Sequence, residues 1–295
     1  MTNAVPRSIQ DYLDQLRAAL SGADPALIQD ALYDAEEYLR GELHEHPDKS
    51  EEQVLAAIAT SYGAPEEVAE AYRTTEVKVQ AALRTPRPPK HRSLPGRFFG
   101  VLSDPRAYTS LFYLLLALFT GIFYFTWAMA GSLMSFAMSS LIIGIPFFLL
   151  FLGSVRMLSL VEGRIVESLL GVRMPRRPPH PGGSVPLFTR IKELLTDGRT
   201  WSTLFYMVLQ LPLGLLYFVL IITWLAVALA LILAPLSKIW DGIIYLNGPI
   251  VFSWFFWPFC VIAGILLLIG LLHAVRGVGH LHGYIAKGLL VRLAD

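Results

Sequence analysis

The sequence predicts an all-α protein, in which a small soluble helical bundle is followed by a four-span transmembrane helical domain built from two parallel-repeat hairpins. The 295 residues are 54% hydrophobic and only 16% charged, whereas soluble proteins carry about 25% charge. Acidic and basic residues are segregated along the chain, and three long stretches have no charged side chain. Disorder and a disulfide-stapled secreted fold are excluded, because aromatic residues make up 12% and Cys260 is the only cysteine.

Charge divides the chain into two regions. Residues 1–83 contain 6 Lys/Arg and 16 Asp/Glu, a net charge of −10, whereas residues 84–295 contain 18 Lys/Arg and 7 Asp/Glu, a net charge of +11. Such a contrast favours two domains. We predict an acidic four-helix domain over residues 1–83, a basic, proline-rich linker over 84–93, and a membrane domain over 94–295.

Helix-start signals recur through the acidic region. Ser8 precedes an apolar stripe, Asp24-Pro25 places an N-cap before a proline at the first helical position, and Ser50 forms a capping box with Gln53. Pro65-Glu-Glu opens a fourth segment after Gly63. Four short amphipathic helices can share one small core.

The segments Asp30-Ala-Leu-Tyr-Asp-Ala-Glu-Glu-Tyr-Leu and Gly63-Ala-Pro-Glu-Glu-Val-Ala carry a family resemblance. With Tyr12-Leu13 and Ser50-Glu-Glu-Gln, they resemble the HAAS-type signalling domain, a helical module of bacterial membrane proteins. The resemblance implies a cytoplasmic module coupled to a membrane region and to a separate transcription regulator. It implies no catalytic residues.

The uncharged stretches are Ala107–Val155, Thr200–Ser237 and Gly242–Val275. Because one span needs about 20 residues, the first suffices for two spans, with a turn near Ala130-Gly131-Ser132. The other two stretches add one span each. The alternative, a buried soluble core, would need several apolar helices longer than those of ordinary globular proteins.

Basic residues predict the orientation. The segments 84–110, 154–203 and 273–295 together hold seventeen Lys/Arg, whereas the loops at the opposite ends of the spans hold only Lys238. We therefore expect a multi-pass protein of the cell membrane with both termini in the cytoplasm.

The membrane region repeats itself. Asp104-Pro-Arg-Ala-Tyr-Thr-Ser-Leu-Phe-Tyr matches Asp197-Gly-Arg-Thr-Trp-Ser-Thr-Leu-Phe-Tyr at an offset of 93, and the ends of the two halves match at an offset of 120. We predict parallel repeats over residues 94–179 and 187–295, related by an axis along the membrane normal. A short amphipathic segment, typical of an interfacial helix, begins each repeat at Leu94 and Leu187.

The Leu-Phe-Tyr pattern, together with Glu162-Gly-Arg-Ile-Val-Glu-Ser-Leu-Leu-Gly-Val-Arg-Met-Pro175, carries a second resemblance. Over roughly residues 100–295 the chain resembles the four-span sensor domain of actinobacterial histidine kinases. Neither a phosphoacceptor histidine segment nor an ATP-binding segment follows it, so any output would pass through the N-terminal domain or another protein.

Two groups of residues are candidate sites. The first is an electrostatic interface between the acidic domain and the basic membrane-proximal surface, comprising Arg106, Arg199, Arg156, Arg276, Glu36 and Glu37. The second is a contact site for an apolar ligand or lipid, comprising Trp240, Tyr245, Trp254, Trp257, Tyr124 and Tyr217. The alternative for the second group is an ordinary interfacial aromatic belt.

No catalytic, metal-binding or cofactor-binding motif is present, so we expect no enzyme activity and no cofactor. His273, His280 and His282 are expected to serve in interfacial anchoring and interdomain hydrogen bonding, with pH sensing as the alternative.

The sequence favours a non-enzymatic membrane sensor that relays a membrane or ligand signal through its helical head to a partner. The alternative is the membrane component of a transporter or a small channel. Expected partners are membrane lipids, a cytoplasmic regulator or membrane partner protein and a second copy in a homo-oligomer, without direct nucleic-acid binding.

Overall fold

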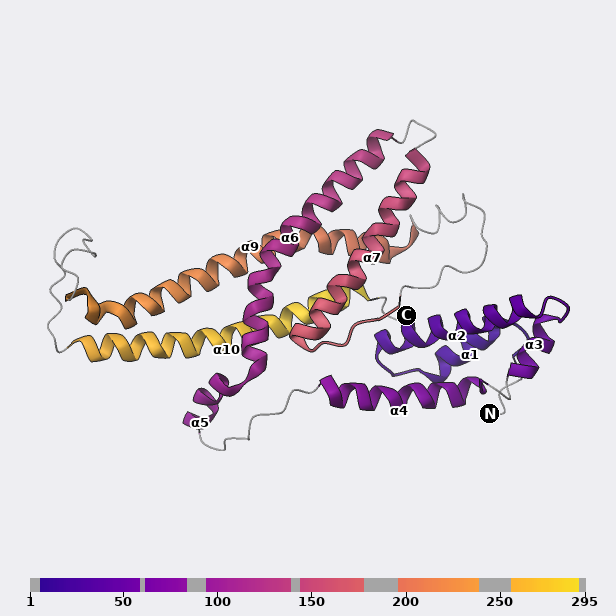
Figure 1. Ribbon diagram of the computed structural model, residues 1–295, viewed down its shortest axis with the longest axis horizontal. Helices are drawn as coiled ribbons and strands as arrows, with labels where there is room; N and C mark the ends of the chain where they lie inside the picture. The colour runs from indigo at the N-terminus through magenta and orange to yellow at the C-terminus, as the bar shows by residue number, and fades with distance from the viewer. Residues whose placement is uncertain are drawn as a thin grey trace. The chain divides into compact units, whose positions relative to one another are not determined.

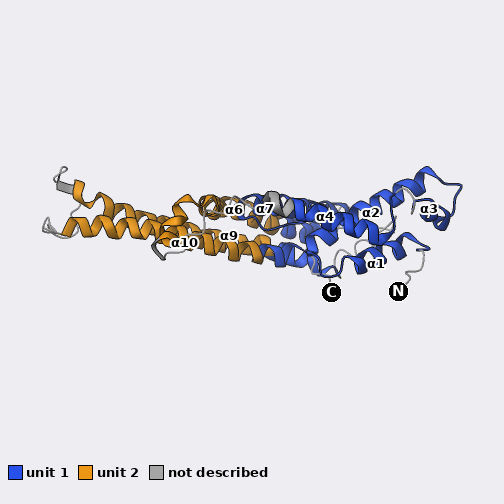
Figure 2. Cartoon of the chain, turned by 90° about the horizontal axis from the view of Figure 1, so that it is seen from below, with its two compact units in different colours: residues 1–84, 131–205, 285–295 blue, residues 85–130, 206–284 orange. Residues whose placement is uncertain are grey.

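The computed structural model describes residues 6–58, 62–83, 94–138, 144–177, 196–238 and 256–291, and within these ranges every regular element is a helix. The chain divides into two compact units (Figure 2). Unit 1 comprises Met1–Arg84, Gly131–Phe205 and Ile285–Asp295, and unit 2 comprises Thr85–Ala130 and Tyr206–Tyr284. The all-α fold class is confirmed, whereas the domain boundaries drawn from charge stay a prediction.

The N-terminal part of unit 1, called the head below, contains α1 (Ile9–Ala19), α2 (Pro25–Glu45), α3 (Glu51–Ile58) and α4 (Pro65–Leu83). The predicted caps are present. Ser8 Oγ accepts a hydrogen bond from the N–H of Asp11 at 3.1 Å, and Asp24 accepts one from Ala26 at 2.9 Å. Ser50 and Gln53 form the reciprocal capping box. Each cap satisfies N–H groups that the first helical turn leaves unpaired.

The head has its own core. Figure 1 shows α1, α2 and α4 beside one another with α3 at one end. Leu16, Leu20 and Leu39 are buried at the centre, as the apolar stripes require. The hydroxyl of Tyr12 donates to the carbonyl of Gly63 at 2.9 Å, and burial raises the pKa of Tyr12, so this donor stays protonated. Gly63 has φ +106°, which only glycine adopts without strain.

Four long helices are apolar enough to cross a membrane: α6 (Pro105–Ala137), α7 (Gly144–Leu170), α9 (Gly198–Leu233, continuing through the 3-10 turn η3, Ala234–Lys238) and α10 (Trp257–Leu290). They carry many exposed large apolar side chains, which suit contact with lipid tails. The protein is therefore a multi-pass membrane protein. Two short elements, α5 (Leu94–Phe99) and the 3-10 turn η1 (Gly100–Ser103), precede α6 where an interfacial helix was expected.

The predicted turn at residues 130–132 is wrong, because α6 continues through these residues to Ala137. Glycine and serine are common in turns, but neither breaks a helix that packs against lipid and other helices. The second predicted interfacial segment, beginning at Leu187, lies outside the described residues.

Within unit 2, α6 and α9 cross at two glycines. A Cβ on Gly121 would lie 2.8 Å from the carbonyl oxygen of Gln210, and a Cβ on Gly214 would lie 2.3 Å from that of Ala117. Gly214 and Gln210 are the counterparts of Gly121 and Ala117 at the offset of 93. The crossing therefore makes the same contact twice, and small residues let the two backbones approach closely.

We expect Gly214→Ala to destabilise the protein by about 1–3 kcal/mol, because its Cβ would overlap the backbone of α6. Gly277→Ala in α10 is the matched control, since nothing lies within 4 Å of its added Cβ. Thermal unfolding in detergent, followed by tryptophan fluorescence, compares the two variants. Equal midpoints would contradict the close crossing.

Candidate functional site

The segment that follows α7 turns back against the helix it has just left. Gly171 has φ +70° and donates its N–H to the carbonyl of Glu167 at 3.1 Å, the geometry of a glycine helix end. Met174 is then fully buried and packs beside Gly163, where an added Cβ would lie at an ordinary contact distance of 3.4 Å. The turn at Gly171 thus lets the segment 172–175 lie close to α7.

This return path brings Arg173 between α7 and the head. Its guanidinium donates from Nη2 to Asp30 of α2 at 3.0 Å, from Nε to Glu76 of α4 at 3.2 Å, and from Nη1 to Glu167 of α7 at 3.1 Å. Nη1 also donates to the carbonyl of Met174 at 2.8 Å. Arg173, Asp30, Glu76 and Glu167 are called the Arg173 cluster below.

All four members of the Arg173 cluster are buried, with side-chain exposures of 9%, 8%, 8% and 5%. Burial acts to lower the pKa of Arg173, but the carboxylates of Glu76, Asp30 and Glu167 outweigh it and the pKa is raised. The guanidinium is therefore always charged. Removing the cation would leave three buried carboxylates facing one another, and breaking a buried ion pair typically costs about 3–5 kcal/mol.

Asp30 binds the same segment a second time. Its Oδ1 accepts the backbone N–H groups of Arg176 at 2.6 Å and Arg177 at 2.9 Å, while Oδ2 receives Arg173. Burial raises the pKa of Asp30, and these three hydrogen bonds act against the rise. One carboxylate of the head thereby fixes both a side chain and the backbone of the segment after α7.

Further contacts surround the Arg173 cluster. Arg177 pairs with Asp34 at 3.0 Å, and Asp34 also accepts the hydroxyl of Tyr72 at 3.0 Å. Gln29 donates to the carbonyl of Arg177 at 2.6 Å and accepts from Arg199, the second residue of α9, at 2.8 Å. Arg177 and Asp34 are more exposed than the cluster, at 51% and 33%, so their pair contributes less to stability, whereas Arg199 is buried.

A last contact reaches the end of α10. Lys287 pairs with Asp24, the N-cap residue of α2, at 2.5 Å. The head therefore contacts the C-terminal part of α7, the N-terminus of α9 and the C-terminal part of α10 within unit 1.

Two of the four arginines proposed from sequence, Arg156 and Arg276, form equivalent ion pairs. Arg156 of α7 pairs with Asp197 at 3.0 Å, and Arg276 of α10 pairs with Asp104 at 2.8 Å. Each aspartate also caps the helix that follows it, accepting the N–H of Arg199 or of Arg106 at 3.1 Å. In each pair, the exit helix of one repeat binds the start of the other repeat.

The glutamates proposed from sequence lie elsewhere. Glu36 is buried and pairs with Arg40 of the same helix at 2.8 Å, while Glu37 is exposed. Asp30, Glu76 and Asp34 of the head instead pair with Arg173 or Arg177 after α7, and Asp24 pairs with Lys287 of α10. Charge counting indicated an acidic head on a basic surface, but the choice among sixteen carboxylates depends on the helix faces left free by the core.

The proposed aromatic contact site is only partly described. Trp240, Tyr245 and Trp254 lie outside the described residues, whereas Trp257 is the first residue of α10. Tyr124 is buried in α6, and Tyr217 lies in α9 with its hydroxyl 3.3 Å from Nδ1 of His282. The ligand-contact role of this group stays a prediction.

His282 is buried in a tyrosine cluster that sequence reasoning missed. The hydroxyls of Tyr113 and Tyr206 lie 2.9 and 3.2 Å from its Nε2. The two tyrosines are counterparts at the offset of 93, which was the available signal. His273, by contrast, contacts the carbonyl of Phe98 at 3.0 Å, and the ring of His280 packs edge-on against Tyr284. His282 therefore joins α6, α9 and α10 inside unit 2.

Asp30→Asn tests the head contact. An amide offers one acceptor oxygen where the carboxylate offers two, so at least one donor loses its partner at a cost of about 1–3 kcal/mol. We expect hydrogen exchange at the amides of Arg176 and Arg177 to rise by roughly ten-fold, measured by mass spectrometry on the full chain. Glu37→Gln, at an exposed position of the same helix, should leave exchange unchanged. Identical exchange in the two variants would refute the assignment of Asp30.

Two protein-family models match the chain, one over the head and one over the membrane helices. Residues 11–71 match the HAAS family model, and residues 113–290, more than half of the chain, match the model described as "Putative sensor". No curated protein and no solved structure gives a match. Among the described residues, no group of three His, Cys, Asp or Glu side chains is arranged to hold a metal ion. The chain therefore belongs to the Sensor family and carries a HAAS domain at its N-terminus.

Proposed function

We propose that the protein is a non-enzymatic membrane sensor that controls access to its HAAS head through the Arg173 cluster. In one state the head is bound to the segment after α7, as in the structure. In the other state the cluster opens, and the head becomes available to a partner protein. The signal is the membrane or ligand condition that changes the arrangement of the spans.

The observation that supports this proposal is that the guanidinium of Arg173 donates to carboxylates of both the head and α7. Asp30 and Glu76 belong to the head, whereas Glu167 belongs to a helix apolar enough to cross the membrane. A displacement of α7 moves Glu167 and the glycine turn that positions Arg173. Since three hydrogen bonds depend on one planar group, a small displacement weakens them together.

The buried charges of the Arg173 cluster also favour the head-bound and the head-released states over intermediate ones. The cluster is stable when all three carboxylates contact Arg173, and each ion returns to water when the head leaves. Intermediate geometries retain the cost of burial without the full pairing energy, so they are disfavoured. The resulting equilibrium needs only a few kcal/mol of differential binding to shift its populations.

The released surface suggests the partner. Residues 1–83 carry a net charge of −10, and opening the cluster exposes Asp30 and Glu76 of adjacent helices. A partner with a basic surface would replace Arg173 and its neighbours. We place the head in the cytoplasm of a cell-membrane protein, with both termini on that side, because the basic residues gather at this end of the spans.

Spin labels test the two states. Cysteines at Glu37 and Ser168, both exposed, are labelled in a Cys260→Ser background, and the distance distribution is measured by pulsed EPR in nanodiscs. We expect Arg173→Gln to weaken head attachment by about 3 kcal/mol or more, so that the distribution lengthens and broadens.

Arg164→Gln is the matched control. Arg164 lies on α7 with Glu167 and contacts its carboxylate at 3.5 Å, but the Arg164 side chain is 55% exposed. This variant should keep the wild-type distribution, because exposed pairs contribute little. A wild-type distribution in the Arg173→Gln protein would refute the proposed function.

A further inference from the structure

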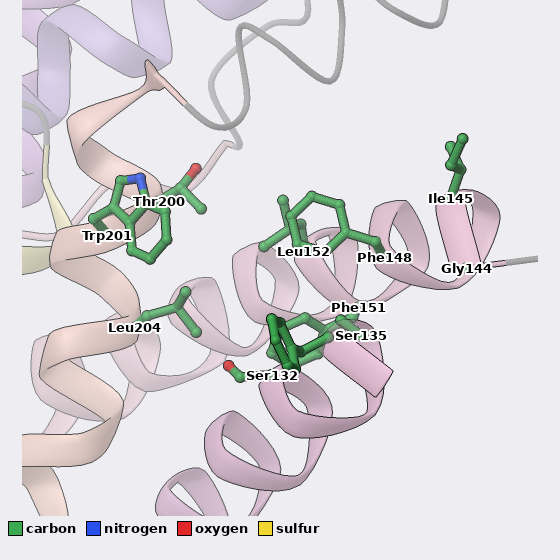
Figure 3. A pocket seen from close by; sticks show the side chains of 11 residues that line it. Ser132, Ser135, Gly144, Ile145, Phe148, Phe151, Leu152, Thr200, Trp201 and Leu204 are labelled. Atoms are coloured by element: carbon green, nitrogen blue, oxygen red, sulfur yellow. The ribbon is translucent and has the colours of Figure 1, made fainter. Parts of the chain in front are cut away.

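Unit 1 contains a cavity of about 390 Å³ between three membrane helices. It is formed by the last turns of α6, the first turns of α7 and the first turns of α9 (Figure 3). Phe148, Phe151 and Leu152 of α7 form one side, and Trp201 and Leu204 of α9 form another. The volume falls within the range of about 300–1,000 Å³ that is typical of small-ligand sites.

The position of the cavity limits what can occupy it. Every residue that lines it lies inside one of two uncharged stretches, Ala107–Val155 or Thr200–Ser237. Most of the lining is aromatic or aliphatic, and Ile145 and Trp201 are partly exposed at 41% and 57%. A polar solute would lose its hydration without compensation there, so the chemistry favours an apolar chain that arrives through the bilayer.

The cavity also has a polar margin. Ser135 and Thr200 both line it, with exposures of 7% and 4%, and neither hydroxyl has a hydrogen-bond partner in the described part of the chain. Arg156 lies one turn beyond Leu152 on the same face of α7, and its buried Nε–H makes no hydrogen bond within those residues. Buried donors of this kind normally find an acceptor.

We propose that this cavity binds a single-chain acidic amphiphile, a long-chain fatty acid, with its alkyl chain among the aromatic residues and its carboxylate toward Arg156. A single alkyl chain suits a site at the small end of the ligand-pocket range. A carboxylate supplies acceptors for the hydroxyl and guanidinium donors at the margin. This inference names the ligand of the sensor proposed above and rests on that function.

Chain connectivity links the cavity to the head. Thr200 and Trp201 immediately follow Arg199, which donates to Gln29 of the head at 2.8 Å. Asp197, which caps α9, is also the ion-pair partner of Arg156. A carboxylate bound at Nε of Arg156 places a second negative charge beside Asp197, which accepts from Nη2 of the same guanidinium, and the repulsion loosens the first turn of α9 from α7. That turn carries the contact to Gln29, so ligand binding loosens the head.

Photolabelling of the full chain in phosphatidylethanolamine and phosphatidylglycerol nanodiscs tests the site. The probe is palmitic acid with a diazirine in its alkyl chain. We expect labelling within residues 132–136, 144–152 and 200–204 that excess unlabelled palmitic acid reduces by about ten-fold or more, because the two molecules compete for one site. Uniform labelling of exposed apolar positions without competition would overturn the proposal, because phospholipid chains would then be the occupants.

Two tryptophan substitutions in α9 provide a matched pair. Leu204→Trp fills the cavity, whereas Leu215→Trp adds the same bulk at a position that is 52% exposed and does not line it. Only the first should abolish competitive labelling. If Leu204→Trp does not insert, the competition experiment on the wild-type chain still decides the outcome.

The spin-label distance measured with and without palmitic acid separates this inference from the proposed function. Competitive labelling together with a longer Glu37–Ser168 distance supports both. Competitive labelling without a distance change supports the site and overturns its role as the signal. A distance that lengthens in Arg173→Gln, without competitive labelling, retains the sensor and overturns the fatty-acid site.

Discussion

The burial of one arginine among three carboxylates is the interaction on which the rest of unit 1 depends. Arg173 donates to α2, α4 and α7 at once, and removing it alone would leave three buried carboxylates without their cation. Its position rests in turn on Gly171, whose positive φ lets the chain reverse after α7. Burial makes the pairing selective, because the charges are stable together and costly apart.

The two halves matched by sequence share one pair of contacts and differ in how they bind the head. Asp104 and Asp197 each cap a membrane helix and bind the arginine of the other repeat, so this pattern is common to both halves. The positions related by the offset of 120 diverge further along: Glu167 in the first repeat corresponds to Lys287 in the second. Glu167 binds the head through Arg173, whereas Lys287 binds Asp24 directly. Glu167 and Lys287 thus occupy matching sequence positions but carry opposite charges, and each takes part in holding the head.

In the proposed mechanism, an apolar ligand acts on the Arg173 cluster through helical turns that the cavity shares with the ion pairs. Leu152 and Arg156 are one turn apart on α7, and Thr200 directly follows Arg199 on α9, so cavity residues and ion-pair residues share the same helical turns. Helices transmit small displacements along their axes because their backbone hydrogen bonds resist extension. Unit 2 has a different character, since the glycine crossing of α6 and α9 and the buried His282 join its helices closely.

Local sequence determined the helices, their caps and the four apolar spans, because capping and hydrophobic periodicity act between residues a few positions apart. Ser8, Asp24 and Ser50 are N-caps for this reason, and the segregation of charge indicated an acidic head beside a basic surface. Only the tertiary structure selected Asp30 and Glu76 over Glu36 and Glu37, since Glu36 is used within α2 while Asp30 faces a segment about 140 residues away. The same limit applies to the tyrosines around His282 and to the cavity beside Trp201. Such sites depend on which helix faces meet, and that is decided by packing between distant segments rather than by local pattern.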